Sequence, residues 1–490
     1  MDLRQGFKVL LISILIFLPM VLITHIGWID STYMGIIANQ IVTTGFVILT
    51  TVTITVTMGS SLAWLFALYD FPLKSLLEKL LILGMVFPSY VLAFFYSEAF
   101  GIFGKTALIV TMVVTTLPYV FMIVTMSIRS QSQQLVHSAM MLGKDYYWIK
   151  LNLLMPLIKP ALILSTLLVI GDTFSEFGAT YFFGVDTVMT GIYEIWFGLH
   201  ESVQGIRFSA WVFVTMATVY YFINAWKKSI IGNQPKLTNS DSPQCIQPIR
   251  IENFKWLYTF LVLTVITITF FIPLGVLVSW ITSTYITTDW VRVLEVTFNS
   301  SVLATLISFL VLLTTTFILY LFKKKMIVVT ALSNALYSTP GIVLTITSIF
   351  IINQTFVGMV ASMFVYVLVL KYLAMGIDSI GVGIQKINRQ YYYSSKTLGK
   401  SSVWYIWNVQ IPMSYQSYLV GGILVWIDVI RELVIGLTLR PQWLSLLSVE
   451  IYRFMDMEKL SSSGPWILAM VLITIIPIYW INLVVKSSKS

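Results

Sequence analysis

The chain is poor in charge, in cysteine and in histidine, and each shortage excludes a class of protein or site. Only 10% of its 490 residues are charged and 58% are hydrophobic, whereas about 25% of a soluble globular protein is charged. A soluble enzyme or binding module is therefore excluded. The single cysteine, Cys245, allows no intramolecular disulfide and no cysteine metal site. The three histidines are scattered and predict no cluster of metal ligands.

Long hydrophobic runs are what the chain has in abundance. A helix needs about 20 apolar residues to cross a hydrocarbon core about 30 Å thick. Twelve runs approach or exceed that length, near 8–27, 46–69, 79–98, 107–128, 160–183, 208–226, 256–280, 299–322, 326–351, 356–377, 415–438 and 465–485. We therefore predict an all-α membrane protein with twelve transmembrane helices.

A polar segment divides these runs into two sets of six. It is rich in proline, asparagine and serine, which favour loops over helices. We predict a first six-span repeat at 1–228, a cytoplasmic linker at 229–254 and a second six-span repeat at 255–490. Because six spans return the chain to its starting side, the two repeats are parallel and related by an axis along the membrane normal.

The distribution of Lys and Arg predicts the orientation in the membrane. Most of the 30 Lys and Arg residues fall on the cytoplasmic side if the N-terminus is inside, as cytoplasmic loops require. We expect a multi-pass protein of the bacterial plasma membrane with both termini in the cytoplasm. The N-terminal run resembles a signal peptide but is followed by no small-residue cleavage site, so we expect a retained span. The net charge of +9 then reflects orientation and contact with anionic lipid, and nucleic acid is not an expected partner.

Two predicted cytoplasmic loops, residues 138–156 and 394–412, repeat one pattern at an offset of 256 residues. The identical pairs are Ser138/Ser394, Leu142/Leu398, Gly143/Gly399, Lys144/Lys400, Trp148/Trp404, Asn152/Asn408 and Pro156/Pro412. Each loop predicts a short helix (139–142 in the first loop and 396–398 in the second), a sharp reversal at the glycine and a second helix. That second helix has aromatic residues that need a partner or lipid to cover them, namely Tyr146, Tyr147, Trp148, Trp404 and Tyr405. Amphipathic loops that lie on the membrane are the alternative.

These loops resemble the conserved cytoplasmic loop of binding-protein-dependent ABC importer permeases, in which a glycine precedes a Leu-Pro by thirteen residues. Gly143 to Pro156 and Gly399 to Pro412 have that spacing. The sequence departs from the family pattern at a glutamate position, which holds His137 and Tyr393. The resemblance implies the fold of a type I ABC importer permease. It also implies that each loop forms a coupling helix that docks on an ATPase subunit, with two ATPase copies per chain.

The chain has no phosphate-binding loop of its own. Two segments come near the pattern, at 104–106 and 399–401, but each lacks the glycine that should stand five residues earlier. We therefore expect no catalytic residue and no bound cofactor in this chain. ATP and magnesium would bind the partner ATPase.

Acidic residues recur in the fifth predicted span of each repeat. Asp172 and Glu176 are four residues apart, and Asp428 and Glu432 follow at the same offset of 256, with Arg431 beside them. One helical turn separates the members of each pair, which predicts that they share a helix face. Acids at membrane depth usually line a cavity or pair with other charges. The acids line or gate a path for a cation, or Arg431 neutralises Asp428 or Glu432 and the acids fix helix ends near the outer interface. Both interpretations stay open, and no stable metal site is expected.

The residues that follow these acids resemble the ferric-iron permeases of the same family. The similar segments are 177–182, 184–185, 190–193, 196–198 and 428–441, although Val434 stands where those permeases usually have proline. The resemblance implies ferric iron as the substrate and an extracytoplasmic substrate-binding protein, which we expect to meet the outer loops at 184–207 and 439–464. Thiamine or another small solute is an alternative substrate. An ion-coupled secondary transporter, which also commonly has twelve spans, is the alternative from another class.

Overall fold

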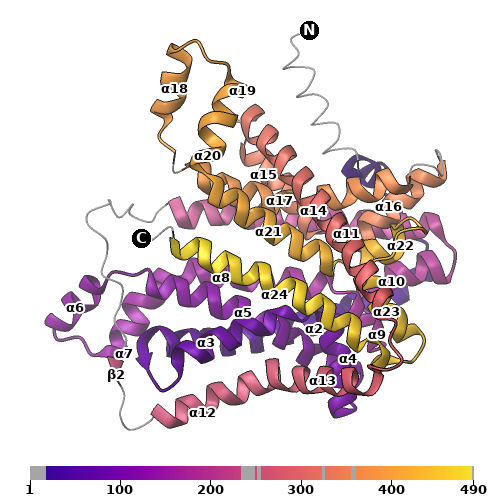
Figure 1. The fold of residues 1–490 in the computed structure, drawn as a ribbon, viewed down its shortest axis with the longest axis horizontal. Coiled ribbons are helices and arrows are strands. Elements are labelled where there is room, and N and C mark those ends of the chain that lie inside the picture. Colours follow the sequence, from indigo (N-terminus) through magenta and orange to yellow (C-terminus); the bar gives the residue numbers. More distant parts are fainter. Residues whose placement is uncertain are drawn as a thin grey trace. The chain divides into compact units, whose positions relative to one another are not determined.

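The computed structural model describes residues 18–232, 249–250, 255–322, 326–354, 360–385 and 387–487. Regular structure in these ranges is almost entirely helical (Figure 1). One short parallel strand pair, β1 (Tyr69–Asp70) with β2 (Ile249–Arg250), is the exception within them. The all-α prediction is therefore confirmed. The first predicted span, 8–27, lies partly outside the described residues.

The chain forms two compact units, each made of segments that are distant in sequence. Unit 2 comprises residues 34–191 and 222–282, and unit 1 comprises 1–33, 192–221 and 283–490. The first span of the second predicted repeat thus belongs to the unit built mainly from the first repeat. The boundaries that we predicted for the two repeats and the linker do not coincide with these units, and they stay a prediction about the sequence.

Unit 2 contains the following helices: most of α2 (Ser31–Leu68), α3 (Lys74–Leu83), η1 (Gly84–Val86), α4 (Ser89–Phe100), α5 (Gly104–Arg129), α6 (Gln133–Met141), α7 (Tyr146–Trp148), η2 (Ile149–Leu154), α8 (Met155–Ser175), α9 (Gly178–Phe182), most of α10 (Val188–Tyr193), α12 (Lys255–Ile266), η4 (Thr267–Phe271) and most of α13 (Ile272–Thr284). Helix α12 packs on α3. Stacked rings of Tyr69 and Tyr258, 5.9 Å apart, join α12 to the end of α2.

Unit 1 contains the remaining helices: η3 (Glu194–Gly198), most of α11 (Ser202–Gly232), α14 (Trp290–Leu321), α15 (Met326–Ser338), α16 (Gly341–Gln354), α17 (Val360–Gln385), α18 (Arg389–Thr397), α19 (Ser402–Tyr405), η6 (Ile406–Gln410), α20 (Ile411–Met413), α21 (Tyr415–Arg431), α22 (Val434–Leu439), α23 (Leu447–Asp456), η7 (Leu460–Ser463) and α24 (Gly464–Ser487). Helices α14, α17 and α21 pack on one another and form its centre.

Among the described residues, seven helices are long and apolar enough to cross a membrane, or up to ten if each of three bent pairs is one span. These ten fall on ten of the twelve runs that we predicted. The other two runs are 8–27 and 208–226, and the second of these lies within α11. The chain is therefore a multi-pass helical membrane protein, and the full count of twelve stays a prediction.

The third predicted span of each half is broken into two helices. The bend is 101° between α3–η1 and α4, and 99° between α15 and α16. A proline stands at each break, Pro88 and Pro340, directly before the second helix. Proline has no N–H to donate and forces the preceding residue out of helical geometry, so both helices end and begin again there.

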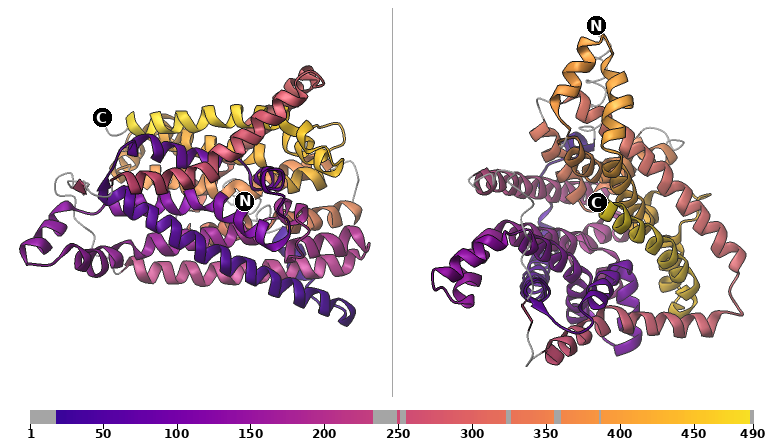
Figure 2. Two further views of the ribbon diagram at one scale, coloured as in Figure 1. Left: turned by 90° about the horizontal axis from the view of Figure 1, so that it is seen from below. Right: turned by 60° about the vertical axis from the view of Figure 1, so that its left-hand side comes forward.

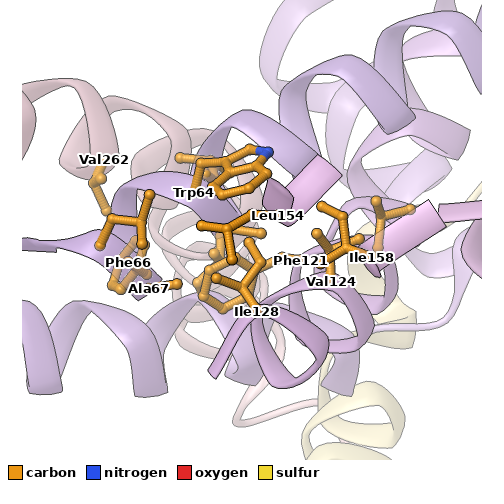
Figure 3. Close-up of a cluster of buried hydrophobic side chains, with 14 of the residues drawn as sticks. Trp64, Phe66, Ala67, Phe121, Val124, Ile128, Leu154, Ile158 and Val262 are labelled. Atoms are coloured by element: carbon orange, nitrogen blue, oxygen red, sulfur yellow. The ribbon is translucent and has the colours of Figure 1, made fainter. Parts of the chain in front are cut away.

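A hydrophobic cluster holds unit 2 together around the ends of α2, α5 and α8 (Figure 3). Phe66 and Phe121 are fully buried and meet edge to face at 5.0 Å. Beside them, Arg129 at the end of α5 pairs with Glu78 of α3 at 2.7 Å and donates to the carbonyl of Phe66 at 3.2 Å. The cluster also includes Val136 of α6, so the base of the following loop is fixed to the unit.

Candidate functional site

Each of the two repeated loops, 138–156 and 394–412, contains a helix–turn–helix that extends beyond the helices that it joins within its own unit. In unit 2 the loop contains α6 and α7, and in unit 1 it contains α18 and α19 (Figures 1 and 2). The predicted pair of short helices around a glycine is therefore present in both halves.

The first helix of each loop begins earlier than we predicted. Ser138 and Ser394 were expected to precede the helices at 139–142 and 396–398, but both serines lie inside α6 and α18, which begin at Gln133 and Arg389. The predicted bounds are wrong because α6 and α18 begin well before these serines. The N–H of Leu142 donates to Ser138, and the N–H of Leu398 donates to Ser394, both at 3.1 Å. The matching serines thus belong to the last turns of these helices.

The first loop reverses at Gly143, whose φ of 74° is in the left-handed region. The N–H of Lys144 donates to the carbonyl of Ala139 at 3.2 Å, and the N–H of Gly143 donates to that of Met140 at 2.9 Å. This pair of bonds is a Schellman motif, the common way in which a helix ends at glycine. The motif satisfies the last carbonyls of α6 and sets the direction of the next helix.

The second loop has the same turn at the same register. Gly399 has a φ of 70°. The N–H of Lys400 donates to the carbonyl of Ser395 at 3.0 Å, and that of Gly399 donates to Lys396 at 3.0 Å. Any residue with a β-carbon is strained at this φ, which explains why both copies keep glycine.

The matching lysines and tryptophans contact each other after the turn. The Nζ of Lys144 lies 4.9 Å from the ring centre of Trp148, and that of Lys400 lies 5.4 Å from Trp404. Such cation–π contacts at exposed sites stabilise by about 0.5–1 kcal/mol. The Nδ2 of the matching asparagine in each loop donates to the tryptophan carbonyl, at 3.2 Å in the first loop and 2.9 Å in the second.

A wider helical turn precedes the proline that ends each loop. Segments η2 and η6 are π-helical, and their closing bonds match: Met155 N–H donates to Lys150, and Ile411 N–H donates to Ile406. A proline ring inside an α-helix clashes with the carbonyl four residues earlier. The wider turn gives the ring room, so the helix continues into the fifth span in the first loop.

The matching leucines, in contrast, point to solvent. Leu142 is 78% exposed and Leu398 is 73% exposed. They stand at the turn, where Leu142 is preceded by Met141, itself 90% exposed. The serine, glycine, lysine, tryptophan, asparagine and proline pairs each have a role within the loop, whereas the leucine side chains form an exposed apolar tip.

The inner faces of the two loops have diverged. Val136 and Ile149 are buried in the first loop. The corresponding residues of the second are Tyr392 and Tyr405, whose rings meet edge to face at 5.2 Å. Tyr405 is only 6% exposed, so our prediction that it is an exposed aromatic is wrong, because Tyr392 covers it.

The remaining aromatics of the loops fit the prediction in part. Tyr147 is 70% exposed, Trp148 is 38% exposed and Trp404 is 39% exposed. The side chain of Tyr146 lies outside the described residues.

The acidic pairs are not arranged as we predicted. Helix α8 ends at Ser175, and Glu176 follows in extended conformation with ψ of 121°. Helix α21 likewise ends at Arg431, and Glu432 has ψ of 113°. The expectation that Asp172 and Glu176 share one face of a continuous helix is wrong for this reason, and it is wrong for Asp428 and Glu432 as well.

Both glutamates cap the short helix that follows them. In unit 2, Glu176 accepts the N–H of Ala179 at 2.8 Å and the hydroxyl of Ser89 at 2.5 Å. In unit 1, Glu432 accepts the N–H of Ile435 at 3.3 Å. An acceptor at this position satisfies a donor that the first turn of a helix leaves unpaired. The glutamates that repeat in the sequence thus mark a helix break that both halves share.

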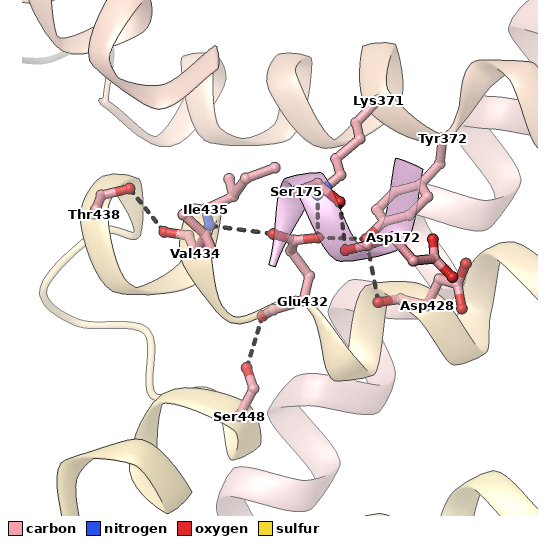
Figure 4. A network of polar contacts seen from close by, with 10 residues as sticks. All are labelled: Asp172, Ser175, Lys371, Tyr372, Asp428, Glu432, Val434, Ile435, Thr438 and Ser448. Atoms are coloured by element: carbon pink, nitrogen blue, oxygen red, sulfur yellow. Dashed lines mark hydrogen bonds and ion pairs between the residues drawn. The ribbon is translucent and has the colours of Figure 1, made fainter. Parts of the chain in front are cut away.

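The ion pair of Glu432 is with Lys371, a residue that we did not single out from the sequence. The Nζ of Lys371 lies 2.6 Å from Oε2 of Glu432 (Figure 4). Our alternative had Arg431 in this role. The signal was present, since Lys371 interrupts the apolar run of α17, but a lone lysine did not identify its partner. Whether the acids of the two halves meet at a common path stays a prediction.

The outer loops contain helices that are capped in a matching way. The N–H of Val188, which opens α10, donates to Thr44 at 2.9 Å. The N–H of Leu447, which opens α23, donates to Ser300 at 2.8 Å. Thr44 and Ser300 are 256 residues apart, so each half anchors an outer helix to its second span.

Of the residues that we expected in these outer loops, Trp443 is 77% exposed, whereas Trp196 is buried. Glu450 is also buried, and it pairs with Arg453 at 2.8 Å. Residues Trp443 and Trp196 thus differ in their availability to a partner. Among the described residues, no group of three or more His, Cys, Asp or Glu could hold a metal ion.

The breaks in the third spans and the exposed leucines of the loops thus recur in the two halves of the chain. Residues 55–226 match the family described as binding-protein-dependent transport system inner membrane component. The chain is also 20% identical over 448 residues, 86% of this chain and 85% of the relative, to the Fe(3+)-transport system permease protein FbpB 2 of Haemophilus influenzae. The predicted resemblance to ABC importer permeases, and to the ferric-iron permeases among them, is confirmed.

Proposed function

We propose that this chain is the transmembrane subunit of an ABC importer, which carries ferric iron delivered by an external binding protein into the cytoplasm. Two copies of a separate ATPase bind the loops at 138–156 and 394–412, and both termini are cytoplasmic. One observation carries the proposal: two segments 256 residues apart have the same turn, the same cation–π contact and the same exposed leucine. An apolar tip repeated in this way fits a partner with two equivalent binding grooves.

Iron as the substrate is supported by the relative, whose name gives Fe(3+) transport. Ferric iron is a hard cation that prefers oxygen ligands. The carboxylates of Asp172 and Asp428, which lie close to the helix breaks, are groups of that kind. Interrupted helices commonly surround transporter substrate sites. Thiamine or another small solute is the alternative substrate of the same kind of importer.

The test compares uptake by two kinds of membrane vesicle, right-side-out and inverted. Both kinds contain the chain together with its ATPase and binding protein. We expect ATP-dependent accumulation of radioactive iron in the direction of import, and co-purification of the ATPase with the chain. Iron uptake that follows an ion gradient in the absence of ATPase would identify a secondary transporter instead. ATP-dependent uptake of thiamine, without uptake of iron, would support the ABC importer and identify thiamine as its substrate.

A double variant tests the acids that we proposed for the path. Asp172→Asn with Asp428→Asn removes both charges while keeping side-chain size. We expect reduced iron uptake with unchanged amounts of the assembled complex. Unchanged uptake would show that these two aspartates are structural.

A further inference from the structure

Lys371 stands in the middle of α17, surrounded by apolar sequence, and its side chain is only 16% exposed. Its Nζ lies 2.6 Å from Oε2 of Glu432, whose side chain is 9% exposed. An unpaired charge in such surroundings is strongly unfavourable, so a buried lysine and a buried glutamate depend on each other. The pair is therefore a fixed part of unit 1.

Tyr372, the next residue of α17, contacts the same carboxylate. Its hydroxyl lies 2.6 Å from Oε2 of Glu432 and 3.2 Å from the carbonyl oxygen of Asp428. The other carboxylate oxygen, Oε1, accepts the N–H of Ile435 at 3.3 Å. Both oxygens of Glu432 thus already have donors from two elements, α17 and α22.

Two further contacts place Glu432 where several helices meet. Its backbone carbonyl accepts the hydroxyl of Ser448 in α23 at 2.8 Å (Figure 4). A β-carbon built on Gly341, the first residue of α16 after the proline break, would lie 3.2 Å from Oε1. The glutamate that ends α21 therefore contacts α16, α17, α22 and α23. The break between α15 and α16 and the break between α21 and α22 thus meet at this side chain.

The first half builds the corresponding junction without a lysine at the equivalent place. Glu176 there accepts the hydroxyl of Ser89, which also follows a proline break. The residues 256 positions before Lys371 and Tyr372 are Thr115 and Thr116. The lysine–tyrosine pair is thus a feature of the second half, whereas the glutamate and its capping role are common to both.

We propose that Lys371 and Tyr372 are positioning residues for transport: they hold Glu432 as a fixed link between the broken helices, and Glu432 does not bind the transported cation. A carboxylate whose two oxygens accept an ammonium, a phenol and a backbone N–H has little capacity left for a metal ion. The link keeps α22 in place while substrate passes. This inference deepens the proposed function and depends on it for the transport readout.

Four variants test the link in the complete complex with ATPase and binding protein: Lys371→Met, Glu432→Gln, the double variant, and Lys371→Arg. Lys79, which is exposed, supplies the control Lys79→Met. The measurements are the thermal midpoint of the purified complex, the maximal rate of radioactive ferric citrate uptake, and the substrate concentration at half-maximal rate.

We expect Lys371→Met to lower the midpoint by about 5 °C or more, because it leaves a buried carboxylate without its cation. The maximal uptake rate falls about tenfold, and the half-saturating concentration stays unchanged. Lys371→Arg keeps both values near those of the wild type. The double variant recovers most of the midpoint and of the rate, because an amide and a thioether leave no charge unpaired.

Two results would overturn the inference. A double variant that recovers its midpoint but loses uptake, or needs a much higher iron concentration, would make Glu432 a cation ligand. A Lys371→Met complex with a thermal midpoint equal to that of Lys79→Met would show that the ion pair does not stabilise the link between the helices. If the wild type carries no iron at all, the proposed function fails, and the midpoints of the four variants still decide whether the link exists.

Discussion

At the scale of single residues, the residue pairs that are identical in the two repeated loops are of two kinds. Gly143 and Gly399 are kept because the backbone needs a left-handed turn. Leu142 and Leu398 are exposed, and burial within the loop does not explain them. The first kind of identity fixes a shape, and under the proposed function the second kind contacts a partner outside the chain.

Substituting both turn glycines tests the shape. In Gly143→Val with Gly399→Val, each valine costs roughly 1–2 kcal/mol in left-handed geometry, and the loops lose their reversal. We expect an assembled permease in which ATP hydrolysis no longer drives uptake. The ratio of transported substrate to hydrolysed ATP is the measurement.

Gly35→Val is the matched control for the glycine variants. A β-carbon added at Gly35 would meet no atom within 4 Å, as at the two turn glycines, but the backbone of Gly35 is helical. The control should keep the transport ratio of the wild type. A normal ratio in the double turn variant would count against the docking role.

Placing a charge on the tip tests the partner. Leu142→Asp and Leu398→Asp change exposed side chains, so each should alter stability by less than about 0.5 kcal/mol. An apolar groove on the ATPase would have to bury the new carboxylate, and we expect the ATPase to be lost on purification. Gln134→Asp, an exposed change at the start of α6, should retain it. Retention of the ATPase by both leucine variants would assign the tips to the membrane surface.

At the scale of elements, the helix breaks are the main feature that the sequence did not yield in full. The hydrophobic runs located ten spans correctly, because apolar length depends on composition alone. They could not show that the third spans bend by about 100°, although Pro88 and Pro340 occupy corresponding places. A proline inside an apolar run is compatible with a mild kink or with a full break, and packing decides between them.

The acids also show a structural feature that the sequence alone could not predict. Their register predicted a paired role for Glu176 and Glu432, and the structure gives them one as caps. The helical spacing that we assumed fails because both helices end one residue earlier. Lys371 was visible as a charge in an apolar run, but its contact with a residue 61 positions away depends on tertiary packing.

Removing the hydroxyl of Ser89 tests the break in unit 2. Ser89→Ala deletes a 2.5 Å hydrogen bond to Glu176, and a lost bond to a charged group costs about 1.5–3 kcal/mol. We expect a lower thermal midpoint of the purified chain. Ser60→Ala, which affects an exposed hydroxyl bonded only weakly to its own helix at 3.3 Å, is the control and should leave the midpoint unchanged. Equal midpoints for the two variants would contradict the role of this bond.

At the scale of the whole molecule, each half of the chain depends on the other, because the two units exchange segments. Helices α12 and α13 follow the linker in sequence, yet they pack in unit 2. There the hydroxyl of Tyr96 donates to the carbonyl of Ile268 at 2.9 Å, and Phe95 contacts Trp280. Unit 2 is therefore incomplete without a segment of the second half.

Dividing the chain within the linker tests this dependence. Fragments 1–240 and 241–490 should accumulate in the membrane when they are expressed together, because packing and hydrogen bonds then complete unit 2. We expect each fragment alone to be degraded. The measurement is the amount of each fragment in membranes, with the intact chain as the reference. Equal amounts of a lone first fragment would show that α12 and α13 are dispensable.

The two loops differ in their interiors and share their exposed tips, and this has a consequence for the proposed ATPase partner. The inner positions of the two loops differ, with valine and isoleucine in the first and tyrosines in the second. The exposed leucines at the two turns are alike, as binding to one kind of ATPase subunit would require under the proposed function. If the proposed function holds, one kind of ATPase subunit is sufficient for both loops, although the interiors of the loops differ.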